Sequence, residues 1–140
     1  MSALYTAEAL ATGAGRNGHT RSSDGLVDHD LAIPKEMGGA GGATNPEQLF
    51  AAGYAACFHS ALQSVARQAK AILGDSTVGA KVSISANDDG GFVLDVALEV
   101  VIPDLPHAEA QALADRAHEV CPDSNATRGN IEVTVTVSDD

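Results

Sequence analysis

The longest amphipathic pattern in the chain runs from Thr44 to about Gly74 and predicts a long helix. Thr44 or Asn45 is a suitable N-cap, Pro46 suits the first helical position, and the acid Glu47 suits the first turn. Apolar or small residues recur at spacings of three, four and one and would form one continuous face: Leu49, Phe50, Gly53, Tyr54, Cys57, Phe58, Ala61, Leu62 and Val65.

Alternating patterns predict strands on both sides of this helix. A first strand is expected within residues 3–10, and Asp24-Gly25 is a strong hairpin signal. The arm that follows this turn alternates at Val27, His29, Leu31 and Ile33. A glycine-rich loop at residues 34–46 then leads to the helix and is suited to lie over a site.

The second half of the chain repeats this alternation of strand and helix. Residues 82–102 form the clearest hairpin, with a turn at 87–91, and a second helix is expected from about Leu105 to Val120. A loop at 121–130 and a final strand at 131–137 complete the pattern. The order of elements predicts an α+β fold, with antiparallel sheets packed around two main helices. A chain of 140 residues is most simply a single domain, 1–140.

Composition narrows the range of partners. A net charge of -11 argues against nucleic acid or an anionic membrane as the main partner, because both would be repelled. The first residues have no basic segment followed by a long apolar one, and the long helix is periodic, so neither a signal peptide nor a membrane span is predicted. We expect a cytoplasmic protein.

The chain has two cysteines, Cys57 on the apolar face of the long helix and Cys121 at a helix-to-loop junction. A buried cysteine is commonly a small hydrophobic side chain. In a reducing compartment, however, two cysteines seldom form a permanent disulfide, and a pair is often catalytic or redox-active. Cys121 lies where a thiol could move toward a partner. Both interpretations of Cys57, structural and reactive, follow from the residues alone.

A reactive Cys57 needs a cation, because its thiol must lose a proton near neutral pH and an ordinary cysteine has a pKa of about 8.5. The helix N-terminus is too distant, since its dipole acts only within the first turn. Arg16, in a glycine-rich turn, is the candidate among eight Lys and Arg residues. Glu47 could hold the guanidinium in place. Alternatively, Arg16 is a solvated turn residue and Glu47 a partner of the helix dipole.

Three motifs give the sequence a strong resemblance to the organic hydroperoxide resistance family of the OsmC-like superfamily. They are, in chain order, the pair "GRNG" and "SSDG", then "ATNPEQLFAAGYAACF", then "CPDSNATRGNI", and the match covers nearly the whole chain. The resemblance implies an OsmC-like fold and an intertwined homodimer. It also implies a thiol peroxidase in which Cys57 is the peroxidatic cysteine and Cys121 the resolving one. The arginine and glutamate of the family match Arg16 and Glu47.

The same resemblance implies the reaction. Cys57 would reduce an organic hydroperoxide to an alcohol, becoming a sulfenic acid that Cys121 converts to a disulfide. An external dithiol, a lipoyl group such as dihydrolipoamide or a lipoylated protein, would then reduce the disulfide, without a resident cofactor or metal. One residue departs from the family pattern: the position after Cys-Pro is commonly aromatic, whereas here it is Asp123.

Apolar residues near Cys57 would favour a substrate with an organic tail. Each CH2 group of the tail that is buried would contribute about 0.8 kcal/mol to the free energy of binding. The expected walls of the pocket are Leu49, Phe50, Tyr54, Phe58 and Met37, although some of them must belong to the ordinary core.

Two alternative functions remain at this point: an osmotically inducible peroxidase of the same superfamily, and a non-catalytic redox sensor or binding module. His59 and His118 lie near the cysteines in sequence but not at a spacing typical of zinc sites, so no metal is expected.

Overall fold

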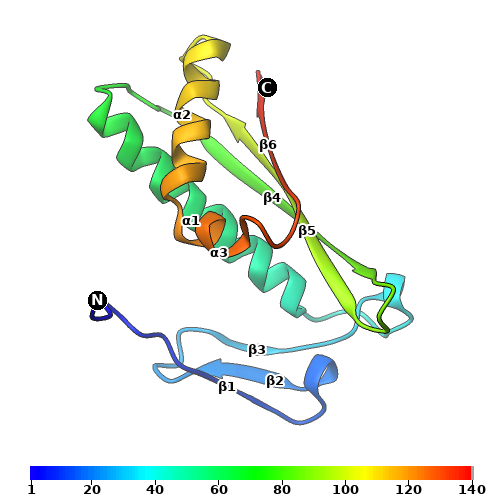
Figure 1. The fold of residues 1–140 in the computed structure, drawn as a ribbon. Helices are drawn as coiled ribbons and strands as arrows, with labels where there is room; N and C mark the ends of the chain where they lie inside the picture. The colour runs from blue at the N-terminus through cyan, green and yellow to red at the C-terminus, as the bar shows by residue number, and fades with distance from the viewer. Residues whose placement is uncertain (140) are drawn as a thin grey trace. The chain divides into compact units, whose positions relative to one another are not determined.

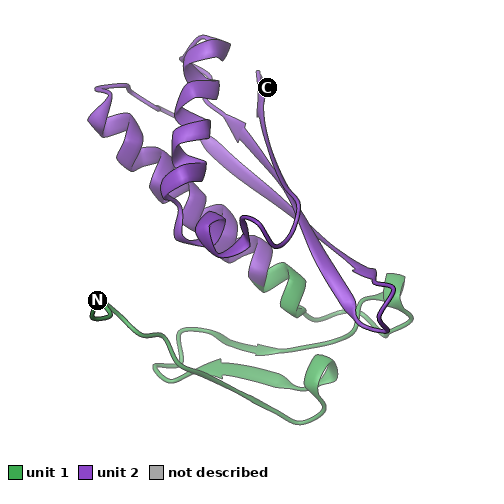
Figure 2. Ribbon diagram, viewed as in Figure 1, with its two compact units in different colours: residues 1–49 green, residues 50–140 purple. Residues whose placement is uncertain are grey.

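A computed structural model describes residues 1–139, which fall into two compact units (Figure 2). Unit 1 comprises residues 1–49 and unit 2 begins at residue 50. The prediction of a single domain over 1–140 stays a prediction. Within the described residues, no helix is sufficiently long and apolar to cross a membrane.

Unit 1 contains a three-stranded antiparallel sheet in the order β1-β2-β3. Its strands are β1 (Ala9–Thr12), β2 (His19–Ser22) and β3 (Asp28–Asp30), and the hairpin predicted at Asp24-Gly25 joins the last two. Two 3-10 turns, η1 (Gly15–Asn17) and η2 (Lys35–Met37), lie in the connecting loops. The first strand begins later than residues 3–10 predicted, and the arm after the turn is shorter.

The long helix α1 (Pro46–Gln68) starts as predicted. The side-chain oxygen of Asn45 accepts a hydrogen bond from the backbone N–H of Gln48 at 2.9 Å, which makes Asn45 the N-cap. The predicted end near Gly74 was wrong. Lys70 adopts a left-handed conformation with φ 57°, and the N–H of Ala71 bonds to the carbonyl of Ala66 at 2.9 Å. This pattern closes a helix and normally uses glycine, so a lysine there gave no signal.

Unit 2 contains a second sheet in the order β4-β5-β6. The predicted hairpin is confirmed as β4 (Thr77–Ala86) paired antiparallel with β5 (Phe92–Val101). The last strand, β6 (Val133–Ser138), pairs with β5 in parallel, so this sheet is mixed rather than antiparallel. The helices between β5 and β6 return the chain to the end of the sheet where β5 began, which makes the pairing parallel.

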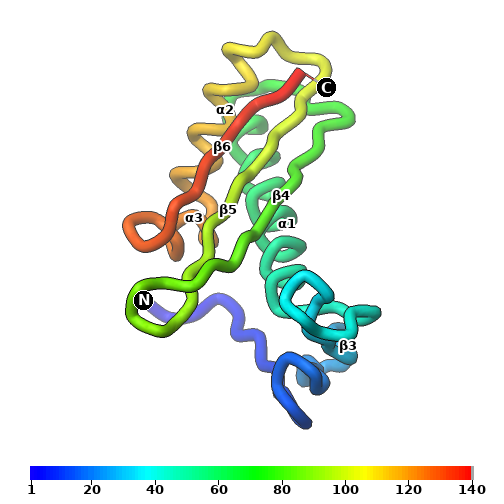
Figure 3. Tube along the Cα trace, turned by 90° about the vertical axis from the view of Figure 1, so that its right-hand side faces the viewer, coloured from blue at the N-terminus to red at the C-terminus, as the bar shows by residue number. Residues whose placement is uncertain are grey.

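The core of unit 2 lies between this sheet and two helices, α1 and α2 (His107–Val120), which cover one of its faces (Figures 1 and 3). Its fully buried side chains include Phe58, Leu62, Val96, Leu98 and Val100. The predicted loop at 121–130 contains a short helix, α3 (Pro122–Thr127). Pro122 occupies its first helical position, a place that suits proline because no N–H is needed there.

Candidate active site

The two cysteines lie together in unit 2. The sulfurs of Cys57, on α1, and Cys121, at the junction of α2 and α3, are 3.5 Å apart, and both thiols are free. Cys121 is fully buried, whereas Cys57 is half-buried. Because a disulfide needs about 2.05 Å, a shift of less than one bond length per sulfur would join them. The arrangement can therefore store and release two electrons.

The surroundings of Cys57 oppose its ionisation. Burial raises the pKa of the Cys57 thiol to about 11, and the neighbouring thiol of Cys121 and the carboxylate of Asp123 also favour the protonated form. One contact acts the other way: the backbone N–H of Asp123 donates to the Cys57 sulfur and lowers its pKa. The departure from the family pattern at Asp123 thus acts on Cys57 directly, and the thiolate needs a further cation.

A cavity of about 380 Å³ opens beside Cys57. Its lining combines apolar surface with two hydroxyl groups and comes from α1 and from the junction of α2 and α3: Cys57, Ser60, Ala61, Ser64, Val120 and Pro122. Val120 is half exposed. A small molecule with an apolar part can therefore reach the more exposed of the two sulfurs.

Arg16 and Glu47 form a two-pronged ion pair within unit 1, as the sequence predicted. The guanidinium nitrogens lie 2.6 and 3.3 Å from the two carboxylate oxygens. The Glu47 side chain is 14% exposed and that of Arg16 35%, so the pair is partly shielded from water. A paired fork of this kind fixes the direction of the guanidinium as well as its position.

The loop that carries Arg16 is held in one conformation. A Cβ atom on Gly18 would lie 2.2 Å from the carbonyl oxygen of Thr12, so only glycine fits there. The side chain of Asn17 accepts a hydrogen bond from the N–H of Ile33 at 3.1 Å. These contacts restrict the turn that presents the Arg16 guanidinium.

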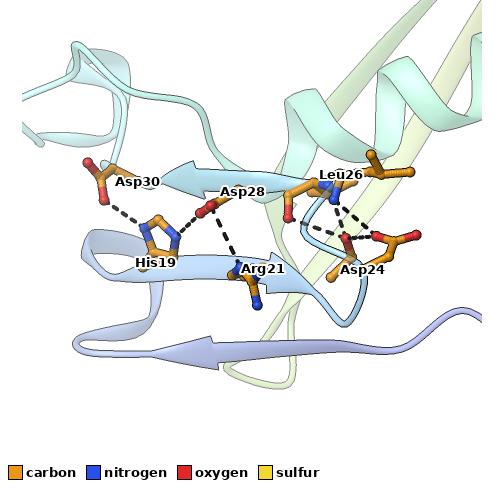
Figure 4. Close-up of polar contacts among 8 residues, drawn as sticks. His19, Arg21, Asp24, Leu26, Asp28 and Asp30 are labelled. Atoms are coloured by element: carbon orange, nitrogen blue, oxygen red, sulfur yellow. Dashed lines mark hydrogen bonds and ion pairs between the residues drawn. The ribbon is translucent and has the colours of Figure 1, made fainter.

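His19 follows this loop and bridges two acids of the neighbouring strand (Figure 4). Its Nδ1 lies 2.7 Å from Asp30 and its Nε2 2.5 Å from Asp28. Arg21 lies 3.7 Å from Asp28 on the same sheet. The hydrogen bonds to Asp30 and Asp28 raise the pKa of His19, because both ring nitrogens donate only in the charged form. In its charged form the ring ties β2 to β3 through both contacts.

The expected pocket residues lie in different environments. Tyr54 and Phe58 are fully buried core side chains and do not line the cavity at Cys57. Phe50 is partly buried against the core, with its ring 6.0 Å from that of Tyr54. Leu49 is half-buried and Met37 is exposed, both in unit 1. A substrate role for these five stays a prediction.

The sequence interpretation missed a buried polar network behind Cys121. Ser124 contacts both Tyr54, at 2.9 Å, and His118, at 2.8 Å. Burial, and then the charge of Arg128, lower the pKa of His118, which is therefore neutral near pH 7. Small polar residues in a predicted loop gave little reason to expect this. Within residues 1–139, no group of three or more His, Cys, Asp or Glu side chains is arranged to hold a metal ion.

Comparisons with known proteins show the family of this chain. The family described as OsmC-like protein matches residues 39–136. An organic hydroperoxide resistance protein from Xanthomonas axonopodis pv. citri is 54% identical over 137 residues, covering 96% of this chain and 95% of the relative.

Two crystal structures of similar proteins resemble the fold closely. An organic hydroperoxide resistance protein from Legionella pneumophila is 56% identical, with a TM-score of 0.94 and coverage of 98% of this chain and 99% of that one. A protein from Vibrio cholerae described as a putative organic hydroperoxide resistance protein, with captopril bound in one of its active sites, is 52% identical. Its TM-score is 0.92, and the match covers 98% of this chain and 94% of that one. These likenesses confirm the predicted α+β fold of OsmC type. The chain therefore belongs to the OsmC-like family and, within it, to the organic hydroperoxide resistance proteins.

Proposed function

We propose that the protein is a thiol-dependent peroxidase of the cytoplasm that reduces organic hydroperoxides to alcohols with Cys57 and Cys121. The observation that carries this proposal is the separation of 3.5 Å between the two sulfurs, one beside an open cavity and the other buried behind it. The exposed thiol suits attack on a substrate, and the buried one suits the second step.

In the first step, the thiolate of Cys57 attacks the terminal oxygen of the hydroperoxide and breaks its O–O bond. The remaining oxygen leaves as an alkoxide and takes a proton to become the alcohol, while Cys57 becomes a sulfenic acid. In the second step, the sulfur of Cys121 bonds to that of Cys57 and the sulfenic oxygen leaves as water. The disulfide protects Cys57 from irreversible oxidation.

Arg16 is proposed to supply the positive charge that this chemistry requires. With a pKa of about 11, only about one Cys57 thiol in ten thousand would be ionised at pH 7. A guanidinium would stabilise the thiolate and then the oxygen that gains charge as the O–O bond breaks. Glu47 would hold Arg16 in that orientation through the two contacts of 2.6 and 3.3 Å.

The cavity at Cys57 favours an organic substrate over hydrogen peroxide. Ala61, Val120 and Pro122 offer apolar surface to a hydrocarbon tail. Each CH2 group removed from water contributes about 0.8 kcal/mol to binding, an interaction that hydrogen peroxide cannot make. For the return reaction we propose a dithiol of the lipoyl type, which fits a two-electron disulfide couple.

We also propose that the working form is a homodimer. Leu10, in β1, is 70% exposed, and Leu26, in the turn after β2, is 86% exposed. The strands of unit 1 have no buried residue. A sheet without a core of its own is marginal in water, so a second copy covering it would account for its composition. Light scattering after size-exclusion chromatography measures the assembly directly.

The reaction is tested by intact mass and peptide mapping after one equivalent of an organic hydroperoxide, with hydrogen peroxide in parallel. The expected product has lost two hydrogens per chain, maps to a Cys57–Cys121 bridge and forms faster with the organic oxidant. Cys121→Ser, as the matched variant, should stop at the sulfenic acid. If both thiols stay reduced, or react slowly and equally with the two oxidants, the peroxidase proposal is wrong.

A further inference from the structure

Buried hydroxyl groups connect α1, which carries Cys57, to α3, which begins immediately after Cys121. Tyr54 Oη, on α1, lies 2.9 Å from Ser124 Oγ and 3.2 Å from Thr127 Oγ1, both on α3. Tyr54 and Ser124 are fully buried and Thr127 is 5% exposed. Tyr54 precedes Cys57 by three residues, and Ser124 follows Cys121 by three. The link therefore joins the helices within one turn of each reactive position.

His118 extends this link to α2. The number of available hydrogens decides which group donates in each hydrogen bond of the link. Ser124 Oγ also lies 2.8 Å from His118 Nδ1, and the Thr127 hydroxyl donates to the Ser124 carbonyl at 3.2 Å. If Ser124 donated to His118, three hydroxyl hydrogens would have to serve four contacts. If His118 donates from Nδ1, one hydrogen serves each: His118 to Ser124, Ser124 to Tyr54, Tyr54 to Thr127, and Thr127 to the carbonyl.

The position of Cys121 depends on this chain of bonds. Helix α3 has six residues, too few for a helix to be stable by its own backbone bonds. Its hydroxyl anchors to Tyr54 hold it against α1, beside which it lies in Figure 1. Cys121 immediately precedes α3 and follows α2, so both flanks of this residue are fixed. A buried hydroxyl without its partner would remain desolvated, which makes the closed network the favoured state.

We propose that Tyr54, Ser124, Thr127 and His118 are positioning residues that hold Cys121 ready to form the disulfide with Cys57. This inference rests on the proposed function for its biological step, in which the Cys121 sulfur displaces the sulfenic oxygen of Cys57 as water. The geometric claim itself concerns only how readily the two sulfurs join. Preorganisation of this kind raises the effective concentration of one thiol near the other.

The test compares Tyr54→Phe, which removes one hydroxyl from the link, with Tyr5→Phe. Tyr5 is the only other tyrosine in the sequence and is 79% exposed, so its variant is a matched control. Each protein is equilibrated with a series of reduced and oxidised dithiothreitol mixtures, quenched with acid, and its disulfide fraction measured by mass. The equilibrium constant for closure should fall about five- to tenfold in Tyr54→Phe and stay unchanged in Tyr5→Phe.

Ser124→Ala cuts the same link from α3 and also frees His118, so its loss should be larger. It serves as the test if Tyr54→Phe does not fold, as judged by circular dichroism. A folded Tyr54→Phe or Ser124→Ala protein that closes its disulfide as readily as the parent would overturn the inference. Because no hydroperoxide is used, this readout is independent of the peroxidase proposal, which fails separately if the parent protein does not react with hydroperoxide.

With hydroperoxide present, a second readout follows the fate of Cys57. A displaced Cys121 gives the sulfenic acid more time to react again, so Tyr54→Phe should accumulate more sulfinic acid, a gain of about 32 Da, than Tyr5→Phe. A general loss of stability without displacement of Cys121 would leave this ratio of products unchanged. An unchanged ratio in folded Tyr54→Phe would contradict the positioning role.

Discussion

Oxidation of Cys57 and Cys121 to a disulfide should stabilise the protein by about 2 to 4 kcal/mol. The cysteines lie 64 positions apart, and a bridge across a loop of this length removes about 4 kcal/mol of chain entropy from the unfolded state. The sulfurs must approach from 3.5 Å to about 2.05 Å, and the backbone adjustment that this requires costs part of the gain. The net gain should therefore be smaller than the entropic limit.

Urea unfolding followed by circular dichroism measures this difference directly. The oxidised protein is compared with protein kept reduced by a phosphine, at equal protein concentration because a dimer would make the midpoint concentration-dependent. Cys121→Ser, treated with the same oxidant, controls for oxidation elsewhere and should show no gain. An oxidised protein that unfolds at the same or a lower urea concentration would refute the view that the reduced fold already resembles the bridged one.

Three further predictions concern single side chains. Glu47→Gln should slow oxidation of Cys57 by hydroperoxide roughly ten- to a hundredfold in stopped-flow experiments, because Arg16 loses its orientation, whereas the exposed Glu36→Gln should react normally. His19 has a raised pKa, so the stability it contributes is complete below its unfolded pKa of about 6.5 and is lost as pH rises through the folded value. As pH rises above about 6.5, the urea midpoint should accordingly fall more steeply in the parent than in His19→Gln, and parallel curves would disprove this. Asp123→Asn removes a nearby negative charge but keeps the backbone N–H, so the pKa of Cys57 should fall below about 11 by ultraviolet titration of the thiolate; no change would exclude the carboxylate as a cause.

The sequence predicts those parts of the fold that depend on local chemistry. The start of α1 follows from Asn45 and Pro46, whose capping and first-turn roles act within a few residues. Its end was not predictable, because Lys70 adopts a left-handed conformation that its side chain does not favour. The parallel pairing of β6 with β5 is a further feature that local patterns do not encode, since it depends on where the intervening helices return the chain.

The contacts of the candidate site also fall into those that the sequence suggests and those that it does not. The contact of Arg16 with Glu47 is one that the sequence suggests, because an arginine in a partly apolar site needs an acid, and the structure contains it. The pairing of Cys57 with Cys121 in a disulfide is implied by the family resemblance, whereas their separation of 3.5 Å as free thiols is not predictable from the sequence. The bonds of Ser124 to Tyr54 and His118 were not foreseen, because they join three helices and one of them was expected to be a loop.

The distance between the cysteines along the chain also affects the protein during its synthesis. A ribosome adds roughly 5 to 20 residues per second, so Cys121 is made roughly 3 to 13 s after Cys57. During this interval Cys57 has the ordinary cysteine pKa of about 8.5, so a small fraction of its thiols is ionised near neutral pH. A sulfenic acid formed then has no resolving partner in its own chain. A sulfenic acid on a nascent chain therefore stays open to further, irreversible oxidation until Cys121 has been made, whereas one in the finished fold lies beside its resolving partner.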